Sequence, residues 1–219
     1  MKKMSEGIYR RNGMIYTINN TDKHKYYDED ILIHLNNYYR QWNPYKSKIS
    51  ASIKKNLKEI PISRESVILY LGSSSGTTVS HISDILTNGK IFAVDSSKEM
   101  MKKFMKLAHN RKNIFPILES ARNYKNYDIP SDTCIDLIIQ DVACVDQVNI
   151  LINNSDYYLK SKGKVLITIK TQCIDSIKKP GIVIEEQKEI LKGKFKILQT
   201  LNLEPFEKNH WLLLMEKRN

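Results

Sequence analysis

The sequence of 219 residues is poor in cysteine and contains no long apolar run. Its three cysteines, Cys134, Cys144 and Cys173, lie far apart, and no Cys-x-x-Cys pair occurs. This spacing argues against zinc and thioredoxin-type motifs, so we expect no metal site, and the odd count favours a reducing compartment. No apolar stretch approaches the ~20 residues that span a bilayer, and the first residues lack the apolar core of a secretion signal. We therefore expect neither secretion nor a membrane partner.

Acidic residues are fewer than basic ones. The chain has 35 Lys and Arg against 24 Asp and Glu, a formal net charge of +11. Such an excess favours a polyanionic partner, although a lysine-rich proteome would give the same composition. With 41% hydrophobic and 27% charged residues, the chain is globular, and its length suits one domain with a small appendage.

Residues 1–41 have a pattern of their own. "GIYRRNGMIYTI" contains two short aromatic-rich strands around Asn12-Gly13, a sequence typical of tight hairpins. A second strand pair is predicted around Asn36-Asn37. We therefore predict a small N-terminal β domain over residues 1–41 and a second domain over residues 42–219.

Helical and strand patterns alternate from Ser47 onward. Apolar residues at helical spacing predict an amphipathic helix over residues 47–60, and four further helices are predicted at 76–86, 97–110, 145–159 and 180–191. Apolar runs predict strands at 66–72, 90–95, 113–118, 134–141, 162–170, 195–203 and 210–218. The alternation predicts a mostly parallel seven-stranded sheet covered on both faces, with a final hairpin that inserts one antiparallel strand at the edge. This Rossmann-like α/β layout is that of class I methyltransferases, and also of many nucleotide-binding proteins.

A glycine turn follows the first strand of this sheet, in "YLGSSSGTT". Gly72 would let the backbone approach a ligand, and Asp95, which ends the second strand, lies at the spacing where a carboxylate accepts hydrogen bonds from ribose hydroxyls. The glycine spacing is not Gly-x-Gly-x-x-Gly, and no lysine follows Gly76, so a dinucleotide and a P-loop are disfavoured. An ordinary turn with a capping aspartate remains the alternative.

Polar side chains also end later strands. Asp141 and Lys170 would emerge at the same carboxyl edge, where open α/β sheets bind ligands. His210 opens the last strand, and Lys48 lies on the helix after "WNPYKSK". The aromatic and basic segment over residues 38–48 could contact nucleic acid or pack as a rigid linker, and packing is the favoured interpretation.

Several strings together resemble the fibrillarin family of RNA 2′-O-methyltransferases. They are "YRQWNPYKSK", "VILYLGSSSGTTVSHISDI", "IFAVDSS", "LESAR", "DVACVDQ", "ITIKTQCIDS" and "LEPFEKNHWLLL", in family order from residue 38 to 215. The resemblance implies S-adenosyl-L-methionine as cofactor and a catalytic set of Lys48, Asp141, Lys170 and His210. It places cofactor contacts at Gly72, Thr77, Thr78, Asp95, Ser96, Ser120, Ala121, Asp141, Val142, Ala143 and Cys144.

The chain departs from the family pattern within this set. Asp95 stands where glutamate is usual, and Ser120 stands where an aspartate would hold the adenine amino group. Cys144 and Val145 replace the usual glutamine and proline. Because serine is neutral, Ser120 is expected to weaken the cofactor contact.

The resemblance also implies a biological setting. It implies the catalytic subunit of a box C/D guide ribonucleoprotein, which acts in rRNA and tRNA processing and modification. Its partners would be a guide RNA, an rRNA substrate, a Nop-domain scaffold protein and a kink-turn-binding protein. A nucleolar location is expected for a eukaryotic source and a cytoplasmic one for an archaeal source. Two alternatives stay open: a structural subunit with impaired cofactor binding, and a protein glutamine methyltransferase acting on histones.

Overall fold

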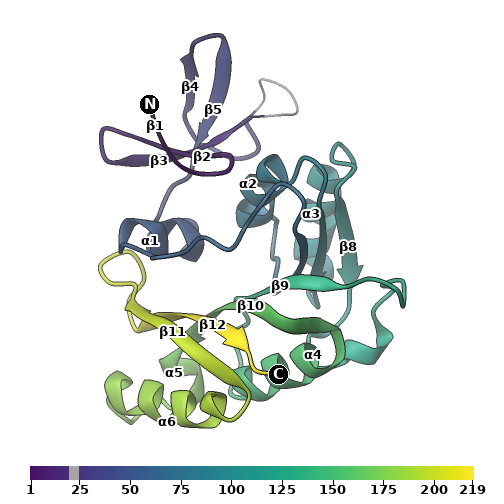
Figure 1. Ribbon diagram of the computed structural model, residues 1–219, viewed down its shortest axis with the longest axis vertical. Coiled ribbons are helices and arrows are strands. Elements are labelled where there is room, and N and C mark those ends of the chain that lie inside the picture. Colours follow the sequence, from purple (N-terminus) through teal and green to yellow (C-terminus); the bar gives the residue numbers. More distant parts are fainter. Residues whose placement is uncertain (20–24) are drawn as a thin grey trace.

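The computed structural model describes residues 1–19 and 25–219 and contains two β-sheets (Figure 1). The N-terminal sheet is antiparallel, in the order β1-β2-β3-β5-β4. Its hairpin turns lie at Asn12-Gly13 and at Leu35-Asn36, where all four residues have positive φ, as two-residue type I′ turns require. The second turn begins one residue before the predicted position. The strands are β1 Lys2–Ser5, β2 Ile8–Arg11, β3 Met14–Ile18, β4 Ile31–His34 and β5 Asn37–Gln41.

The second sheet has seven strands in the order β11-β12-β10-β9-β6-β7-β8. Its pairs are parallel except those of β12, which runs antiparallel to both β10 and β11. The predicted mostly parallel sheet is confirmed, and the antiparallel strand lies one place inside the edge. The strands are β6 Val67–Leu71, β7 Lys90–Asp95, β8 Ile114–Leu118, β9 Ile135–Gln140, β10 Leu159–Lys170, β11 Phe195–Asn202 and β12 His210–Lys217.

Helices cover both faces of the large sheet, and each face has its own hydrophobic core. One core joins α1 Lys48–Lys54, α2 Thr77–Ile85 and α3 Lys98–Ala108 to the N-terminal sheet (Figure 1). The other joins α4 Gln147–Tyr158 and α6 Pro180–Lys192, with the short helices α5 Thr171–Ile174 and η1 Tyr124–Asn126 nearby. Within the described ranges, no helix has the length and apolar character needed to cross a membrane.

The first helix is shorter than the apolar spacing predicts. α1 ends at Lys54, and Asn56 takes a left-handed conformation with φ of 64°. The amide of Leu57 then donates to the carbonyl of Ser52 at 2.9 Å, and that of Asn56 donates to Ile53 at 3.2 Å. These two bonds form a Schellman motif, in which asparagine replaces the usual glycine. Leu57 remains buried, so its apolar character serves the core and not a longer helix.

A buried ion network joins the N-terminal sheet to α2. Arg40 on β5 contacts Glu29 and Asp84, both at 2.7 Å, and Arg111 contacts Asp84 at 2.8 Å. All four side chains have 0% exposure. Because buried charges are costly unless they are paired, the network fixes the sheet against the helix. Arg40 also lies in the aromatic and basic segment over residues 38–48, which therefore has a packing role, as favoured from the sequence.

Candidate active site

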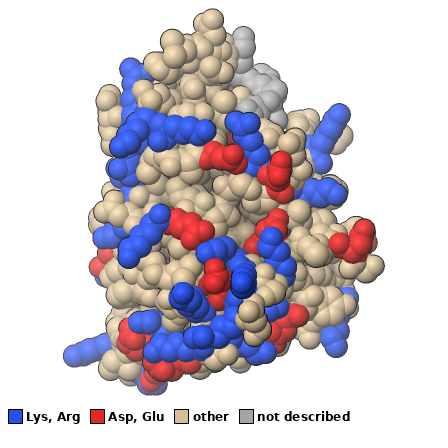
Figure 2. Space-filling model, in the orientation of Figure 1, with Lys and Arg blue, Asp and Glu red and all other residues tan. Residues whose placement is uncertain are grey.

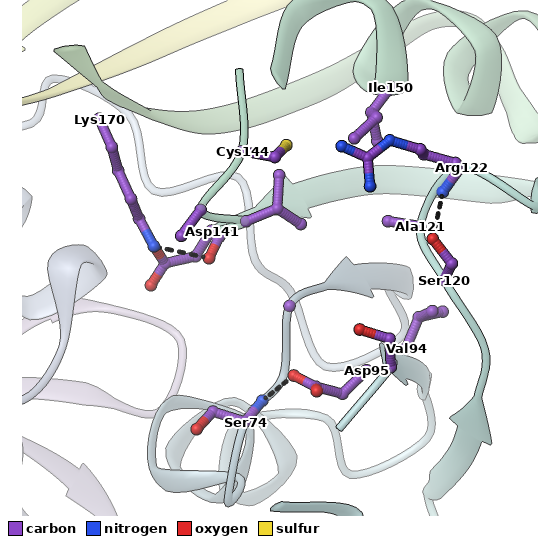
Figure 3. Close-up of a pocket in the computed structure, with 14 residues that line it drawn as sticks. Ser74, Val94, Asp95, Ser120, Ala121, Arg122, Asp141, Cys144, Ile150 and Lys170 are labelled. Atoms are coloured by element: carbon purple, nitrogen blue, oxygen red, sulfur yellow. Dashed lines mark hydrogen bonds and ion pairs between the residues drawn. The ribbon is translucent and has the colours of Figure 1, made fainter. Parts of the chain in front are cut away.

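A cavity of about 280 Å³ opens at the carboxyl edge of the large sheet (Figure 3). Its walls come from the segments that follow β6 to β10, which is the edge where parallel α/β sheets bind ligands. The lining residues are Gly72, Ser74, Val94, Asp95, Ser96, Ser120, Ala121, Arg122, Asp141, Val142, Ala143, Cys144, Ile150 and Lys170.

The first wall of the cavity is the glycine turn after β6. Gly72 has a φ of +86°, and a Cβ atom at this position would lie 2.8 Å from the carbonyl oxygen of Asp141. Gly76 has a φ of +89°, and a Cβ atom there would overlap the ring of Phe104. Only glycine combines this conformation with such close approach. The two glycines therefore let the turn pack between β9 and α3 while α2 begins directly after it.

The Asp95 carboxylate ends β7 and faces the turn. Its Oδ2 accepts a hydrogen bond from the amide of Ser74 at 2.7 Å, and its Oδ1 accepts one from the amide of Ser97 at 2.9 Å. An ionised carboxylate has about four acceptor sites. Two sites are therefore left for a ligand, and the orientation of the carboxylate is already fixed by the two backbone amides.

Ser120 and Arg122 lie at the other end of the cavity, near Cys144 and Ile150 (Figure 3). Ser120 Oγ accepts the Arg122 amide at 3.3 Å. The Arg122 guanidinium donates to both oxygens of Asp146, at 2.8 and 2.5 Å. Burial, and then the adjacent Asp146, raise the pKa of Cys144 to about 11, so this thiol is neutral near pH 7. Apart from the ion pair between Arg122 and Asp146, this end of the cavity is uncharged.

These walls fit a nucleoside better than a phosphate. Asp95 would repel a phosphate and accept from ribose hydroxyls, while Val94 and Ile150 offer apolar surface to a base. Among residues 1–19 and 25–219, no cluster of three His, Cys, Asp or Glu is placed to hold a metal ion.

A charged cluster lies beside the cavity, built from positions far apart in the sequence. Lys170 Nζ lies 2.8 Å from Asp141 Oδ1, and Lys48 Nζ lies 3.3 Å from Asp141 Oδ2. Lys170 Nζ also donates to the carbonyl oxygen of Asp141 at 3.0 Å. The three side chains are between 14% and 23% exposed, so a substrate can reach them while they remain shielded from bulk water.

A second carboxylate, Glu207, completes this cluster. It comes from the loop between β11 and β12, and its Oε1 lies 3.4 Å from Lys48 Nζ. Burial opposes protonation of Lys48, but Asp141 and Glu207 together outweigh it, so the pKa of Lys48 is raised. Lys48 is therefore held as an ammonium group, which can position an anion but cannot accept a proton.

Gln147 fixes the backbone of Lys170. Its Oε1 accepts the Lys170 amide at 2.9 Å, and its Nε2 donates to the Lys170 carbonyl at 3.1 Å. The side chain is fully buried at the start of α4. His210 lies directly opposite Lys170 in the β10–β12 ladder, and its Nδ1 contacts the carbonyl oxygen of Lys208 at 2.7 Å. Of the expected catalytic set, Lys48, Asp141 and Lys170 are therefore in contact, and His210 is adjacent to them through its ladder position opposite Lys170.

The threonines expected at the cofactor lie elsewhere. Thr78 Oγ1 donates to Ser47 Oγ at 3.1 Å, beside Lys48. Thr77 lines a separate cavity of about 440 Å³ next to Tyr26 and Tyr27. The part of the chain that the structure describes does not place either threonine on the lining of the first cavity. Their cofactor contacts stay predictions, and so do those of the other expected site residues.

Sequence reasoning missed Glu207, Gln147 and the side chain of Arg122. Glu207 belongs to "LEPFEKNHWLLL" and Gln147 to "DVACVDQ", so both lay inside strings that carried the family resemblance. Nothing in the charge pattern separates Glu207 from the other glutamates of the sequence. Its partner, Lys48, lies 3.4 Å away in space and on another element, so only the folded chain brings the two together.

The strand order and the cavity define a class of protein. The large sheet is mostly parallel, with β12 inserted antiparallel between β10 and β11, and a nucleoside-sized cavity lies at its carboxyl edge. This is the architecture of S-adenosylmethionine-dependent class I methyltransferases. Within this class, the family of the chain can also be assigned. The fibrillarin family matches residues 1–219, and the chain belongs to this family.

Relatives and solved structures agree with this assignment. A fibrillarin-like rRNA/tRNA 2′-O-methyltransferase from Methanocaldococcus jannaschii is 44% identical over 187 residues, which cover 85% of this chain and 81% of the relative. A solved Methanococcus jannaschii fibrillarin, described as a pre-rRNA processing protein, superposes with a TM-score of 0.94 at 40% identity, over 100% of this chain and 97% of the other.

Two further structures contain partners or ligands of their own. Aeropyrum pernix fibrillarin with natively bound S-adenosyl-L-methionine has a TM-score of 0.85 and 31% identity, over 98% of this chain and 100% of that one. A fibrillarin from a fibrillarin/Nop5p complex has a TM-score of 0.89 and 32% identity, over 99% and 100% of the two chains.

Proposed function

We propose that this chain is an S-adenosylmethionine-dependent RNA ribose 2′-O-methyltransferase, the catalytic subunit of a box C/D guide ribonucleoprotein in rRNA modification and processing. The observation that carries the proposal is the pair of lysines held on Asp141 at the rim of a nucleoside-sized cavity. One lysine suits proton transfer, and the other suits an anionic substrate.

The cavity fits S-adenosylmethionine. Asp95 would accept hydrogen bonds from its ribose hydroxyls, Val94 and Ile150 would flank the adenine, and Ser120 Oγ would face the adenine amino group. Bound there, the cofactor supplies a methyl group already activated on a positively charged sulfur. The protein therefore has two tasks, which are to hold the ribose hydroxyl in line and to remove its proton.

Lys170 removes the proton in this proposal. A positioned base contributes about 10²–10⁴-fold to a rate, and alignment of the reacting groups contributes up to about 7–11 kcal/mol. Asp141 orients the Lys170 amine through the 2.8 Å contact, and Gln147 fixes the strand end that carries it. Lys48, held as a cation, and His210, which lies opposite Lys170 in the ladder, would position the ribose and its phosphate. The proton passes from the 2′-hydroxyl to the Nζ of Lys170 in its neutral form.

Partners supply the choice of target site. Lysine contacts to phosphate provide affinity but little sequence information, so a guide RNA that pairs with the rRNA would select the nucleotide. A Nop-domain scaffold is supported by the fibrillarin/Nop5p complex of a relative. A kink-turn-binding protein completes the particle that we propose.

The test is Lys170→Ala in a particle reconstituted with guide RNA, Nop-domain protein and kink-turn-binding protein. Transfer of radiolabelled methyl to a complementary target should fall at least about 100-fold, the lower end of what a positioned base contributes. Cofactor affinity measured by calorimetry should change by less than about threefold, a small free energy on the affinity scale. Lys178→Ala, which removes a surface lysine paired with Glu186, is the matched control and should keep full activity. Normal turnover by Lys170→Ala would refute the assignment of the base.

The same assay separates the alternatives. Ser120 is the residue that favours a structural subunit, because a neutral side chain faces the adenine end of the cavity. If wild-type protein bound no S-adenosylmethionine at millimolar concentration, the structural role would replace catalysis. Methyl transfer to histone glutamine, with none to guided RNA, would favour the protein methyltransferase.

A further inference from the structure

A basic groove lies on the N-terminal sheet, outside the site described above. Lysine and arginine side chains gather over this sheet in the upper left of Figure 2. A cavity of about 390 Å³ there lies between the β1–β2 hairpin and the segment after α1. Lys2, Lys3, Arg10 and Lys58 line it, and none of its described lining residues is acidic. We call this cavity the basic groove.

The charges of the basic groove are poorly neutralised by the protein itself. Lys2 lies directly opposite Arg10 in the β1–β2 ladder, and like charges at opposed positions destabilise a sheet. Arg10 Nε is buried and has no hydrogen-bond partner among the residues that the structure describes. An anion in the groove would relieve both unfavourable features.

The acidic residues nearest in sequence are occupied elsewhere. Glu6 accepts the amide of Arg64 at 2.8 Å, and Glu59 contacts Lys164 at 3.2 Å. By contrast, lysines on α6 each have a glutamate on the same helix, as in the Lys188–Glu185 contact at 2.8 Å. The groove is therefore a place where positive charge is concentrated and left open to an external anion.

The floor of the groove suits a sugar-phosphate backbone. Met4, Leu57 and Ile60 provide apolar surface between the basic side chains. Ser5 Oγ is buried there without a hydrogen-bond partner in the described part of the chain. Apolar contact and a hydroxyl fit a ribose, while the surrounding cations fit the phosphates on either side.

The groove is also close to the charged cluster at Asp141. Lys48 opens α1, and Leu57, on the lining of the groove, lies three residues after Lys54, the last residue of that helix. A helix of this length is about 10 Å long, at about 1.5 Å per residue. One RNA molecule can therefore contact both places. We propose that the basic groove binds the phosphate backbone of RNA at a distance from the ribose that reacts, an inference that takes the identity of the polyanion from the proposed function.

The experiment compares two triple variants with equal net charge. Lys2→Gln/Arg10→Gln/Lys58→Gln removes the groove charges, and Lys188→Gln/Lys192→Gln/Lys194→Gln removes three charges in and just after α6, at the other end of the molecule (Figure 1). Fluorescence anisotropy measures binding of a labelled single-stranded RNA between 50 and 200 mM salt. Each lost phosphate contact lowers the slope of log K against log salt by about 0.7 for single strands. The groove variant should therefore lose about 2 from the slope and bind about tenfold more weakly, while the α6 variant keeps the wild-type slope.

A second measurement uses the wild-type protein, so that it does not depend on how the variants fold. RNA should protect Lys2, Lys3 and Lys58 from acetylation by a water-soluble reagent, read by mass spectrometry, and leave Lys188 reactive. Equal slopes for the two variants, or no protection, would overturn the proposal. Equal protection by polyglutamate would also overturn it, because the groove would then be a site for acidic peptides. A wild-type protein that bound no S-adenosylmethionine and transferred no methyl group would overturn the proposed function without changing these RNA-binding readouts.

Discussion

Replacement of Gly72 by alanine tests how the cavity is built. The residue has a φ of +86°, and its new Cβ would lie 2.8 Å from the carbonyl oxygen and 3.0 Å from the carbonyl carbon of Asp141. The left-handed backbone costs about 1–2 kcal/mol for an L-residue, and overpacking against rigid backbone adds about 1–3 kcal/mol. We therefore expect Gly72→Ala to lower the free energy of unfolding by about 2–5 kcal/mol, measured by urea denaturation.

The activity of Gly72→Ala should fall as well. The backbone that must move belongs to Asp141, which holds Lys48 at 3.3 Å and Lys170 at 2.8 Å. A displacement of about 1 Å in a reacting site can cost about 100-fold in rate, so a shift of a few tenths of an ångström should still be measurable as slower methyl transfer. Gly181→Ala is the control, because nothing lies within 4 Å of its Cβ position in the first turn of α6. Its stability should stay within about 0.5 kcal/mol of wild type. A Gly72→Ala protein with wild-type stability and turnover would refute this account of the turn.

Three other substitutions probe separate features. Ser120→Asp should bind S-adenosylmethionine about fivefold more tightly in calorimetry, since a hydrogen bond to a charged acceptor is stronger by about 1 kcal/mol than one to a neutral acceptor. Unchanged or weaker binding would contradict the placement of the adenine amino group at residue 120. Glu207→Gln removes one of the two carboxylates that raise the pKa of Lys48, so an NMR titration of Lys48 should shift to lower pH; an unshifted titration would argue against their coupling. Burial, and then Arg40 and Arg111, lower the pKa of His81 well below 6.5. As the pH falls, the unfolded chain therefore protonates His81 before the folded chain does, and below about pH 6.5 the free energy of unfolding should decrease by up to about 1.4 kcal/mol per pH unit. His81→Gln should lack this part of the pH dependence, and an unchanged pH dependence would exclude His81 as its source.

Local pattern predicted most of the fold because each strand of the large sheet is a short apolar run with clear limits. It failed at the end of α1, where Leu57 and Ile60 continue the helical spacing but Asn56 turns the chain. The spacing of apolar residues indicates which side chains are buried, but it does not indicate the backbone conformation of a polar residue such as Asn56 that lies between them. It also placed the antiparallel strand at the edge, whereas pairing on both sides puts β12 inside β11.

The site was predictable where topology alone brings residues together. Asp141 directly follows β9 and Lys170 is the last residue of β10, and these are adjacent parallel strands, so their contact follows from the fold. Lys48 and His210 came from the family resemblance, because no rule of strand order places the start of α1 beside Asp141. Glu207 was not found because its contact with Lys48 depends on how the β11–β12 loop folds back.

The buried network around Asp84 bears on any attempt to shorten the protein. Asp84 lies on α2, which starts directly after Gly76, and without residues 1–41 it would lose Arg40 and keep Arg111 as a cationic partner. Breaking a buried pair costs about 3–5 kcal/mol, which is comparable with the whole stability of many domains. A catalytic fragment that starts at Trp42 would thus carry an intact list of site residues on an unsupported helix. The smallest unit that can hold the cofactor turn in shape includes the amino-terminal strands.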